Sequence, residues 1–206
     1  MDSRAFFRCL VAGAALSVAV PLPARAQNGP LGPIHSDHPN LIASLTRVYA
    51  GSPTWREAIG EVSATGRRMF VLTPDKVRVT DSAGKHRPFD EDVLAEVHPV
   101  ADADARIEAV IVVINLPLLE RLYSDATMAQ LEVDLDRIVA HEVYGHAIPY
   151  LLAGTLSGKC ADPVPGERAR ESCAIRRENE IRRELRLGER RSYGLDGLAL
   201  ARRFRN

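Results

Sequence analysis

The sequence predicts an α+β protein, and three observations support this class. Two stretches before residue 65 have the apolar spacing of amphipathic helices. The middle of the chain holds short alternating or β-branched runs, which are typical of strands. The last third has helical spacing again, over two long stretches. We therefore expect N-terminal helices and a short β-sheet, followed by a largely helical C-terminal half.

Length and charge limit the classes of function. The chain has 206 residues, with 27 basic and 27 acidic side chains. A chain of this length is expected to form a single domain. An apolar share of 46% allows a sizeable core and argues against wholesale disorder. Zero formal charge argues against general nucleic-acid binding, which needs a basic surplus.

Residues 1–26 have the pattern of a signal peptide. Two arginines precede an apolar stretch over 9–20, and residues 24–26 (Ala-Arg-Ala) form an A-x-A cleavage signal. The apolar stretch has about 12 residues, whereas about 20 are needed to span a bilayer. We expect cleavage after Ala26 and a mature protein that is periplasmic or secreted, with no integral membrane segment.

Removal of the signal peptide leaves two cysteines, Cys160 and Cys173. An even pair in a chain bound for an oxidising compartment predicts a disulfide bond. On the entropic account, so short a loop adds about 3 kcal/mol to the free energy of unfolding. Two zinc-binding thiolates are the alternative, but this separation of the cysteines is not a usual ligand spacing.

The first half of the mature chain is predicted to hold two helices and three strands. Residues 27–40 are rich in Gly, Pro, Asn and His, which indicates a flexible lead-in to a domain over 41–206. The predicted elements are helices over 41–49 and 55–62, strands over 68–73 and 76–80, an acidic irregular segment over 87–105, and a strand within 107–119. This last strand is a continuous β-branched run, so we expect it to be buried on both faces.

Two long helices are predicted in the second half. The first begins near Thr127, is weakened at Pro149 and stops by Gly154. The second begins near Pro165 and ends near Leu187, where the next residue is a glycine. A third, short helix is expected over 195–204.

One stretch carries chemistry, and it runs from His141 to His146 as H-E-V-Y-G-H. This H-E-x-x-G-H pattern is one residue longer than H-E-x-x-H, in which two histidines bind zinc and the glutamate activates water. Five positions put His141 and His146 about 140° apart on a regular α-helix, too wide for a shared metal. A π-type turn would bring them onto one face, and Gly145 tolerates that distortion. We therefore predict one Zn²⁺ bound by these histidines, with Glu142 as general base.

A zinc site of this type needs a third protein ligand. Glu178 lies within the apolar stripe of the second long helix, and Glu171 lies two turns earlier on the same side. A carboxylate in such a stripe is costly unless it is paired. Both are candidates, one as the metal ligand and the other as the hydrogen-bond partner of a ligand. Glu180 points to the opposite side of the helix and is a weaker candidate for the third ligand. Ion pairs with the many nearby arginines are the alternative for each.

These residues carry two resemblances. The H-E-x-x-G-H spacing resembles that of dipeptidyl peptidase III, a zinc exopeptidase whose third ligand is a downstream glutamate. The stretch at 178–193 is similar to the E-N-x-x-R-x-E-L…R-x-S-Y ending of small bacterial effector-type zinc metallopeptidases, which belong to the gluzincin group. The segment from Glu171 to Ala174 matches the E-x-x-A segment that donates a ligand in that group. Together they cover roughly residues 135–193 and imply a small zincin-like domain.

The sequence departs from both families in ways that concern the third ligand. The effector family usually has the shorter H-E-x-x-H, and the register of dipeptidyl peptidase III favours Glu180. The two resemblances do not alter the roles expected for His141, Glu142 and His146.

Motif and resemblance together predict an exported zinc metallopeptidase that acts on a peptide or protein substrate. Glu142 would take a proton from the attacking water and pass it to the leaving amine. The oxyanion donor suggested by the C-terminal signature is Tyr193, with Tyr144 and His98 behind it. The strand at 110–114 would bind an extended peptide along its edge. The alternative is a non-catalytic, zinc-stabilised protein-binding domain.

Overall fold

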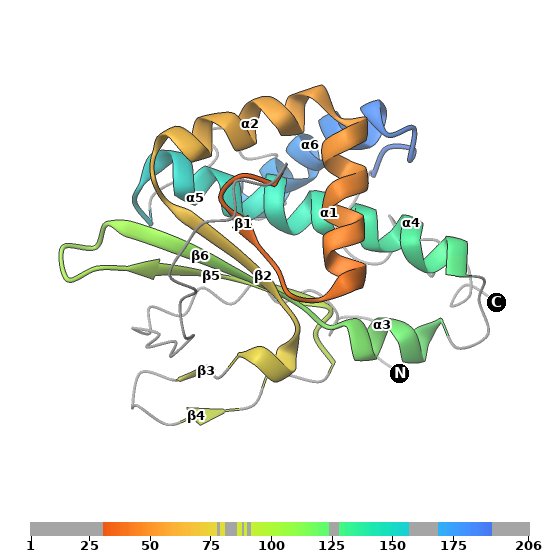
Figure 1. The fold of residues 1–206 in the computed structure, drawn as a ribbon, viewed down its shortest axis with the longest axis horizontal. Helices are drawn as coiled ribbons and strands as arrows, with labels where there is room; N and C mark the ends of the chain where they lie inside the picture. Colours follow the sequence, from red (N-terminus) through yellow and green to blue (C-terminus); the bar gives the residue numbers. More distant parts are fainter. Residues whose placement is uncertain are drawn as a thin grey trace.

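A computed structural model describes residues 31–77, 79–80, 86–87, 89, 92–123, 128–156 and 169–190. The predicted signal peptide, Cys160, Tyr193 and the short helix expected over 195–204 lie outside these residues. The α+β class is confirmed, because the described residues form helices and a four-stranded mixed sheet (Figure 1).

The sheet has the strand order β1-β2-β6-β5. Its strands are β1 (Ile34–His35), β2 (Arg68–Leu72), β6 (Ile107–Ile114) and β5 (Ala95–Ala101). The first three run parallel to one another, and β5 is antiparallel to β6. The strands β3 (Val79–Thr80) and β4 (His86–Arg87) form a separate antiparallel pair.

The strand β6 is central and buried on both faces, as its β-branched run predicts. Val110 and Val112 belong to the main hydrophobic core beneath the helices, and Ile111 and Val113 belong to a second apolar cluster. Both edges of β6 are hydrogen-bonded, to β2 on one side and β5 on the other. The expectation that a peptide adds along residues 110–114 is therefore wrong.

The strand β5 lies within the segment over 87–105 that was expected to be irregular. Glu96 and His98 interrupt the apolar pattern of this strand, so the sequence alone did not indicate a strand here. Both are almost wholly buried, and Oε2 of Glu96 lies 2.9 Å from Nε2 of His98. Because each side chain partners the other, the strand accommodates two polar groups against an apolar cluster.

Seven helical segments of more than one turn are described, and most lie over one face of the sheet (Figure 1). They are α1 (Pro39–Gly51), α2 (Pro53–Ala64), α3 (Leu116–Leu122), α4 (Met128–Val139), η2 (Ala140–Ala147), α5 (Ile148–Ala153) and α6 (Ala169–Glu184). A short 3₁₀ turn, η1 (Pro74–Lys76), follows β2. None of the helices among the described residues is long and apolar enough to cross a membrane.

Sequence signals account for several helix boundaries. Ser52 accepts a hydrogen bond from the Trp55 amide and so caps the start of α2, directly after α1 ends. Asn115 caps α3 in the same way, through the Leu118 amide. Gly154 ends α5 with a left-handed φ of 67°, as the predicted stop requires. Residues 31–40, which were expected to be a lead-in, contribute β1 and the start of α1.

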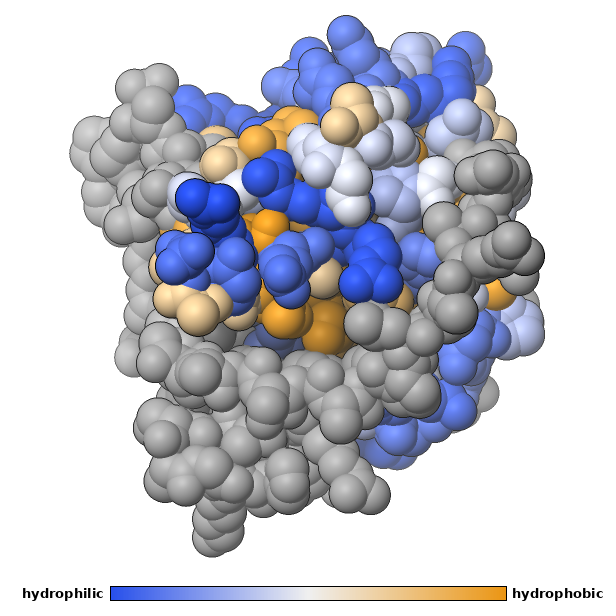
Figure 2. All heavy atoms as spheres, turned by 60° about the vertical axis from the view of Figure 1, so that its left-hand side comes forward, coloured by the Kyte–Doolittle hydropathy of each residue, from blue (hydrophilic) through white to orange (hydrophobic). Residues whose placement is uncertain are grey.

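The described surface is mainly polar on the face shown in Figure 2. Hydrophilic residues cover most of the described part of that face, and apolar residues show between them. The core itself lies between the helices and the sheet, with Trp55, Leu119 and Ile148 among its fully buried side chains. The histidine motif lies within this layer.

Candidate metal centre

The histidine motif occupies a π-helical segment. The segment η2 lies between α4 and α5, so one continuous helix contains a wider stretch in its middle. At its end the Ile148 amide donates to the carbonyl oxygen of Val143, five residues earlier. The widened turn predicted from the spacing of the histidines is therefore confirmed.

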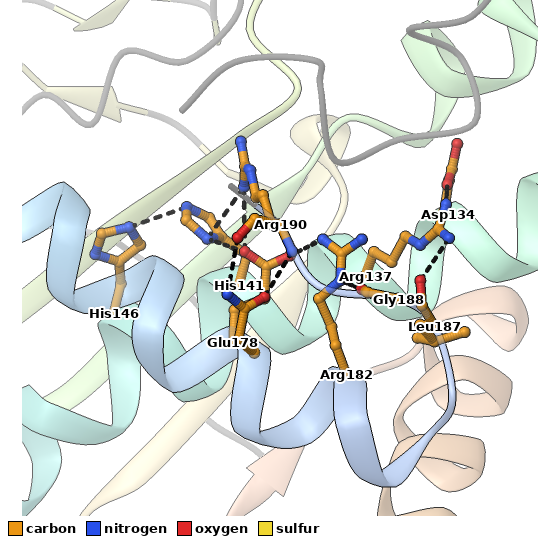
Figure 3. Close-up of polar contacts among 10 residues, drawn as sticks. Asp134, Arg137, His141, His146, Glu178, Arg182, Leu187, Gly188 and Arg190 are labelled. Carbon is orange, nitrogen blue, oxygen red and sulfur yellow. Dashed lines mark hydrogen bonds and ion pairs between the residues drawn. The ribbon is translucent and has the colours of Figure 1, made fainter. Parts of the chain in front are cut away.

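This turn brings the two histidines together (Figure 3). Nε2 of His141 lies 3.3 Å from Nε2 of His146, and the two rings are nearly perpendicular, at 86°. Both side chains are buried, with 1% and 3% of their surfaces exposed. Two nitrogens that share a tetrahedral zinc at the usual bond length lie about 3.3–3.4 Å apart. The pair thus has the separation that a shared metal requires.

The helix α6 packs directly against the widened turn. A Cβ atom at Gly145 would lie 3.1 Å from the Cα, Cβ and carbonyl oxygen of Ala174. Any side chain here would push α6 away by a few tenths of an ångström, so glycine favours this close approach. Glu142 lies on the same segment as the histidines and is also buried.

Glu178 contacts the ring nitrogen of His141 that faces away from His146. Oε2 of Glu178 lies 2.9 Å from Nδ1 of His141, whereas Nε2 is the atom directed at His146. A histidine that binds a metal through Nε2 usually donates its Nδ1 hydrogen to a carboxylate. Of the two roles left open for Glu178, the geometry matches the partner of a ligand, and not the ligand itself.

Three cationic or hydrogen-bonding groups surround the Glu178 carboxylate. Nη1 of Arg182 lies 2.6 Å from Oε1, and Nη1 of Arg190 lies 3.2 Å from Oε2. Burial alone would raise the pKa of Glu178, but the hydrogen bond and charge of His141, together with Arg190 and Arg182, lower it to about 2. The carboxylate is therefore an anion at any pH near neutrality.

Contacts in the structure explain the residues of the E-N-x-x-R sequence that begins at Glu178. Asn179 holds the backbone of Arg190 through two hydrogen bonds, of 2.7 and 2.8 Å. Arg182 binds both Glu178 and the carbonyl oxygen of Gly188. Through these contacts Asn179 and Arg182 hold in place the groups that surround Glu178.

Sequence reasoning missed Arg190, which is buried and lies 3.3 Å from Nδ1 of His141. A signal for it was present, because Arg190 is the arginine of the R-x-S-Y pattern. From that pattern only the tyrosine, Tyr193, was predicted to have a role. Only the folded chain shows that the arginine points back to α6.

The position of Glu171 follows from the register of α6. Ala174 lies against Gly145, and Glu178 lies against His141, so α6 runs antiparallel to η2. Glu171 is in the first turn of α6 and therefore at the end of η2 that carries His146. Among the described side chains, which do not include that of Glu171, no three His, Cys, Asp or Glu residues gather as a metal site.

The remaining candidates have other partners. Oε2 of Glu180 accepts a hydrogen bond of 3.0 Å from the hydroxyl of Tyr144, so neither group is directed at the histidine pair. Burial, together with Glu180, raises the pKa of Tyr144 to about 12. His98 pairs across the sheet with Ile111, in the cluster on the other face of the sheet from the main core. Tyr144 and His98 thus have partners away from the histidine pair, and the role of either as oxyanion donor stays a prediction.

Only one cysteine of the predicted disulfide, Cys173, lies among the described residues. Cys173 is buried in α6, next to Ala174. Cys160 and Tyr193 are outside the described residues, so the disulfide and the tyrosine's role stay predictions.

Comparisons with known proteins do not identify a relative. A scan against protein-family models and searches of curated proteins and of solved structures find no match to this chain.

Proposed function

We propose that this protein is an exported zinc-dependent metallopeptidase. His141 and His146 bind the metal through their Nε2 atoms, and Glu142 acts as the general base. The observation that carries the proposal is the 3.3 Å separation of those two atoms within a buried π-helical turn. Imidazole nitrogens with one carboxylate form a ligand set that suits zinc.

Glu171 is the third ligand in this proposal. The carboxylate of Glu178 is already engaged by Arg182, Arg190 and the Nδ1 side of His141. Glu180 is engaged by Tyr144. Glu171 is the remaining candidate on α6, and its backbone lies at the His146 end of the pair. The E-x-x-A resemblance at 171–174 supports the same choice.

The catalytic roles follow from these positions. A zinc ion held by His141, His146 and Glu171 would lower the pKa of a water molecule and polarise a carbonyl group. Glu142 would act as the general base that accepts a proton and passes it to the leaving nitrogen. Glu178 accepts a hydrogen bond from Nδ1 of His141, which holds the hydrogen on Nδ1 and leaves the lone pair of Nε2 for the metal. Burial of the site excludes bulk water from these charges.

A peptide substrate is proposed from the resemblance, and the fold offers a place for it. The strand β5 is the last strand in the sheet order and packs against η2. Within the described residues, no strand pairs with its outer side. An extended peptide that adds to this edge would lie beside the histidine motif.

The test combines metal content with peptide cleavage. Zinc in the purified mature protein is measured by mass spectrometry, and cleavage is measured on a mixed peptide library. Glu142→Gln is expected to keep the zinc and to lose cleavage. Glu132→Gln, at an exposed position of α4, is the matched control and is expected to change neither. Cleavage that persists in Glu142→Gln would exclude the assigned general base.

One observation favours the second candidate, a non-catalytic zinc-stabilised binding domain. Both histidines are almost wholly buried, and a closed site is typical of a structural metal, whereas a catalytic metal keeps one position open. This candidate predicts bound zinc, a lower melting temperature in the presence of chelator, and no cleavage of any library peptide.

A further inference from the structure

The segment at 187–190, here called the return segment, folds back onto the helices that build the site. Gly188 has a left-handed φ of 70°, which turns the chain after α6. Nη2 of Arg137 donates to the Leu187 carbonyl at 2.8 Å, and Nε of Arg182 donates to the Gly188 carbonyl at 2.7 Å. With the two bonds to Asn179, the backbone of the return segment is fixed at three places.

The return segment places the side chain of Arg190 next to His141 and Glu178 (Figure 3). Arg190 is buried, and its Nη1 lies 3.2 Å from Oε2 of Glu178. The same oxygen lies 2.9 Å from Nδ1 of His141. A guanidinium group only donates hydrogen bonds, so Nη1 of Arg190 donates to Oε2 of Glu178. The same Nη1 lies 3.3 Å from Nδ1 of His141, farther from that nitrogen than Oε2 is. Arg182 holds the other oxygen, Oε1.

The arrangement determines which nitrogen of His141 carries the hydrogen. A carboxylate oxygen at 2.9 Å from Nδ1 favours the hydrogen on Nδ1, because two lone pairs at that distance would repel. Nε2 then carries the lone pair, directed at His146. The position of Oε2 thus sets both the tautomer and the orientation of the ring.

Stability alone does not account for Arg190. Burial of a guanidinium group costs free energy, and Arg182 already neutralises the Glu178 carboxylate. What Arg190 adds is a donor on the particular oxygen that meets His141.

We propose that Arg190 is a positioning residue of the metal centre. Held at its backbone by Asn179, it fixes the Glu178 carboxylate, which in turn orients the His141 ring for the metal. The inference rests on the proposed function, because it takes Nε2 of His141 as a zinc ligand.

The experiment measures zinc dissociation constants by competition with a chromophoric chelator. Arg190→Gln and Asn179→Ala are each expected to weaken zinc binding by about 10–100-fold, as loss of a ligand's partner does. Asn179→Ala is informative because Asn179 touches neither histidine in the described contacts. The control, Arg186→Gln, changes an exposed arginine nearby and is expected to shift the constant by no more than about twofold.

A second measurement needs no metal. Nitrogen-15 NMR of the metal-free protein is expected to show His141 protonated on Nδ1 in the wild type, with more of the Nε2–H form in Arg190→Gln. Unchanged zinc affinity and an unchanged tautomer in a folded Arg190→Gln variant would overturn the inference. Wild-type protein that binds no zinc would instead overturn the proposed function, and the tautomer would still report on Arg190.

Discussion

Nε2 of His141 and Nε2 of His146 lie 3.3 Å apart, although the residues are five positions apart in the chain. A regular α-helix would separate their directions by about 140°, so the π-helical turn is what makes a shared metal possible. The turn is accompanied by the close packing of Gly145 on Ala174. The geometry of the candidate site therefore depends on the contact between η2 and α6.

The first prediction concerns this contact. A methyl group at position 145 would lie 3.1 Å from three atoms of Ala174, two of them backbone. Gly145→Ala is expected to lower the free energy of unfolding by about 1–3 kcal/mol, as overpacking does, and to weaken zinc binding. Urea denaturation of the metal-free protein and chelator competition measure the two effects.

The matched control for Gly145→Ala is Gly60→Ala. A Cβ atom at this exposed position of α2 meets nothing within 4 Å. Its greater helix propensity is expected to raise the free energy of unfolding by about 1 kcal/mol. Destabilisation by Gly145→Ala together with stabilisation by Gly60→Ala supports the close approach of α6, and stabilisation by both would contradict it.

The second prediction separates two glutamates of α6. Glu171→Ala removes a proposed ligand and is expected to leave the purified protein without stoichiometric zinc. Glu178→Ala removes the partner of His141 and is expected to keep the site but weaken it by about 10–100-fold. Zinc content and dissociation constants of the two variants, measured together, decide between the roles. The reverse ranking would make Glu178 the ligand.

The third prediction concerns acid stability. The pKa of Glu178 is lowered from 4.5 to about 2 in the folded protein, so its charge stabilises the fold above pH 4.5. That contribution is lost as the pH falls from 4.5 towards 2. In metal-free protein, the stability difference between wild type and Glu178→Gln should shrink over this interval. A difference that stays constant in urea unfolding across these pH values would show that the charge contributes nothing.

The fourth prediction concerns Tyr144. Its hydroxyl donates to Glu180, and its ring stacks on Trp55 and lies under the Arg177 guanidinium. Tyr144→Phe is expected to lower the free energy of unfolding by about 0.5–1.5 kcal/mol, the value of one hydrogen bond. Zinc content and cleavage rate should remain at the wild-type level. A large loss of cleavage with full zinc content would support Tyr144 as an oxyanion donor.

Local patterns predicted the parts of the fold that depend on neighbours in sequence. The five-residue spacing of His141 and His146, with Gly145 between them, was enough to predict the π-type turn. The β-branched run over 110–114 predicted a strand buried on both faces. The apolar stripe of α6 predicted that Glu178 would be buried. Each of these follows from periodicity along one element.

What the sequence did not show depends on contacts between distant elements. The strand β5 was missed because Glu96 and His98 are buried next to each other as an ion pair, which the hydrophobicity of single residues does not reveal. The ring nitrogen that Glu178 contacts depends on how α6 docks against η2. Arg190 was missed because it follows the end of a helix, where no periodicity applies.

The partners of His141 come late in the chain, and this has a consequence for metal loading. Glu178 follows His141 by 37 positions, and Arg190 follows it by 49. A polypeptide still being synthesised has the histidine motif before it has the carboxylate and the packing that align the two Nε2 atoms. Zinc is thus expected to enter only after α6 has docked. The compartment in which the protein folds would then be the one that supplies its metal.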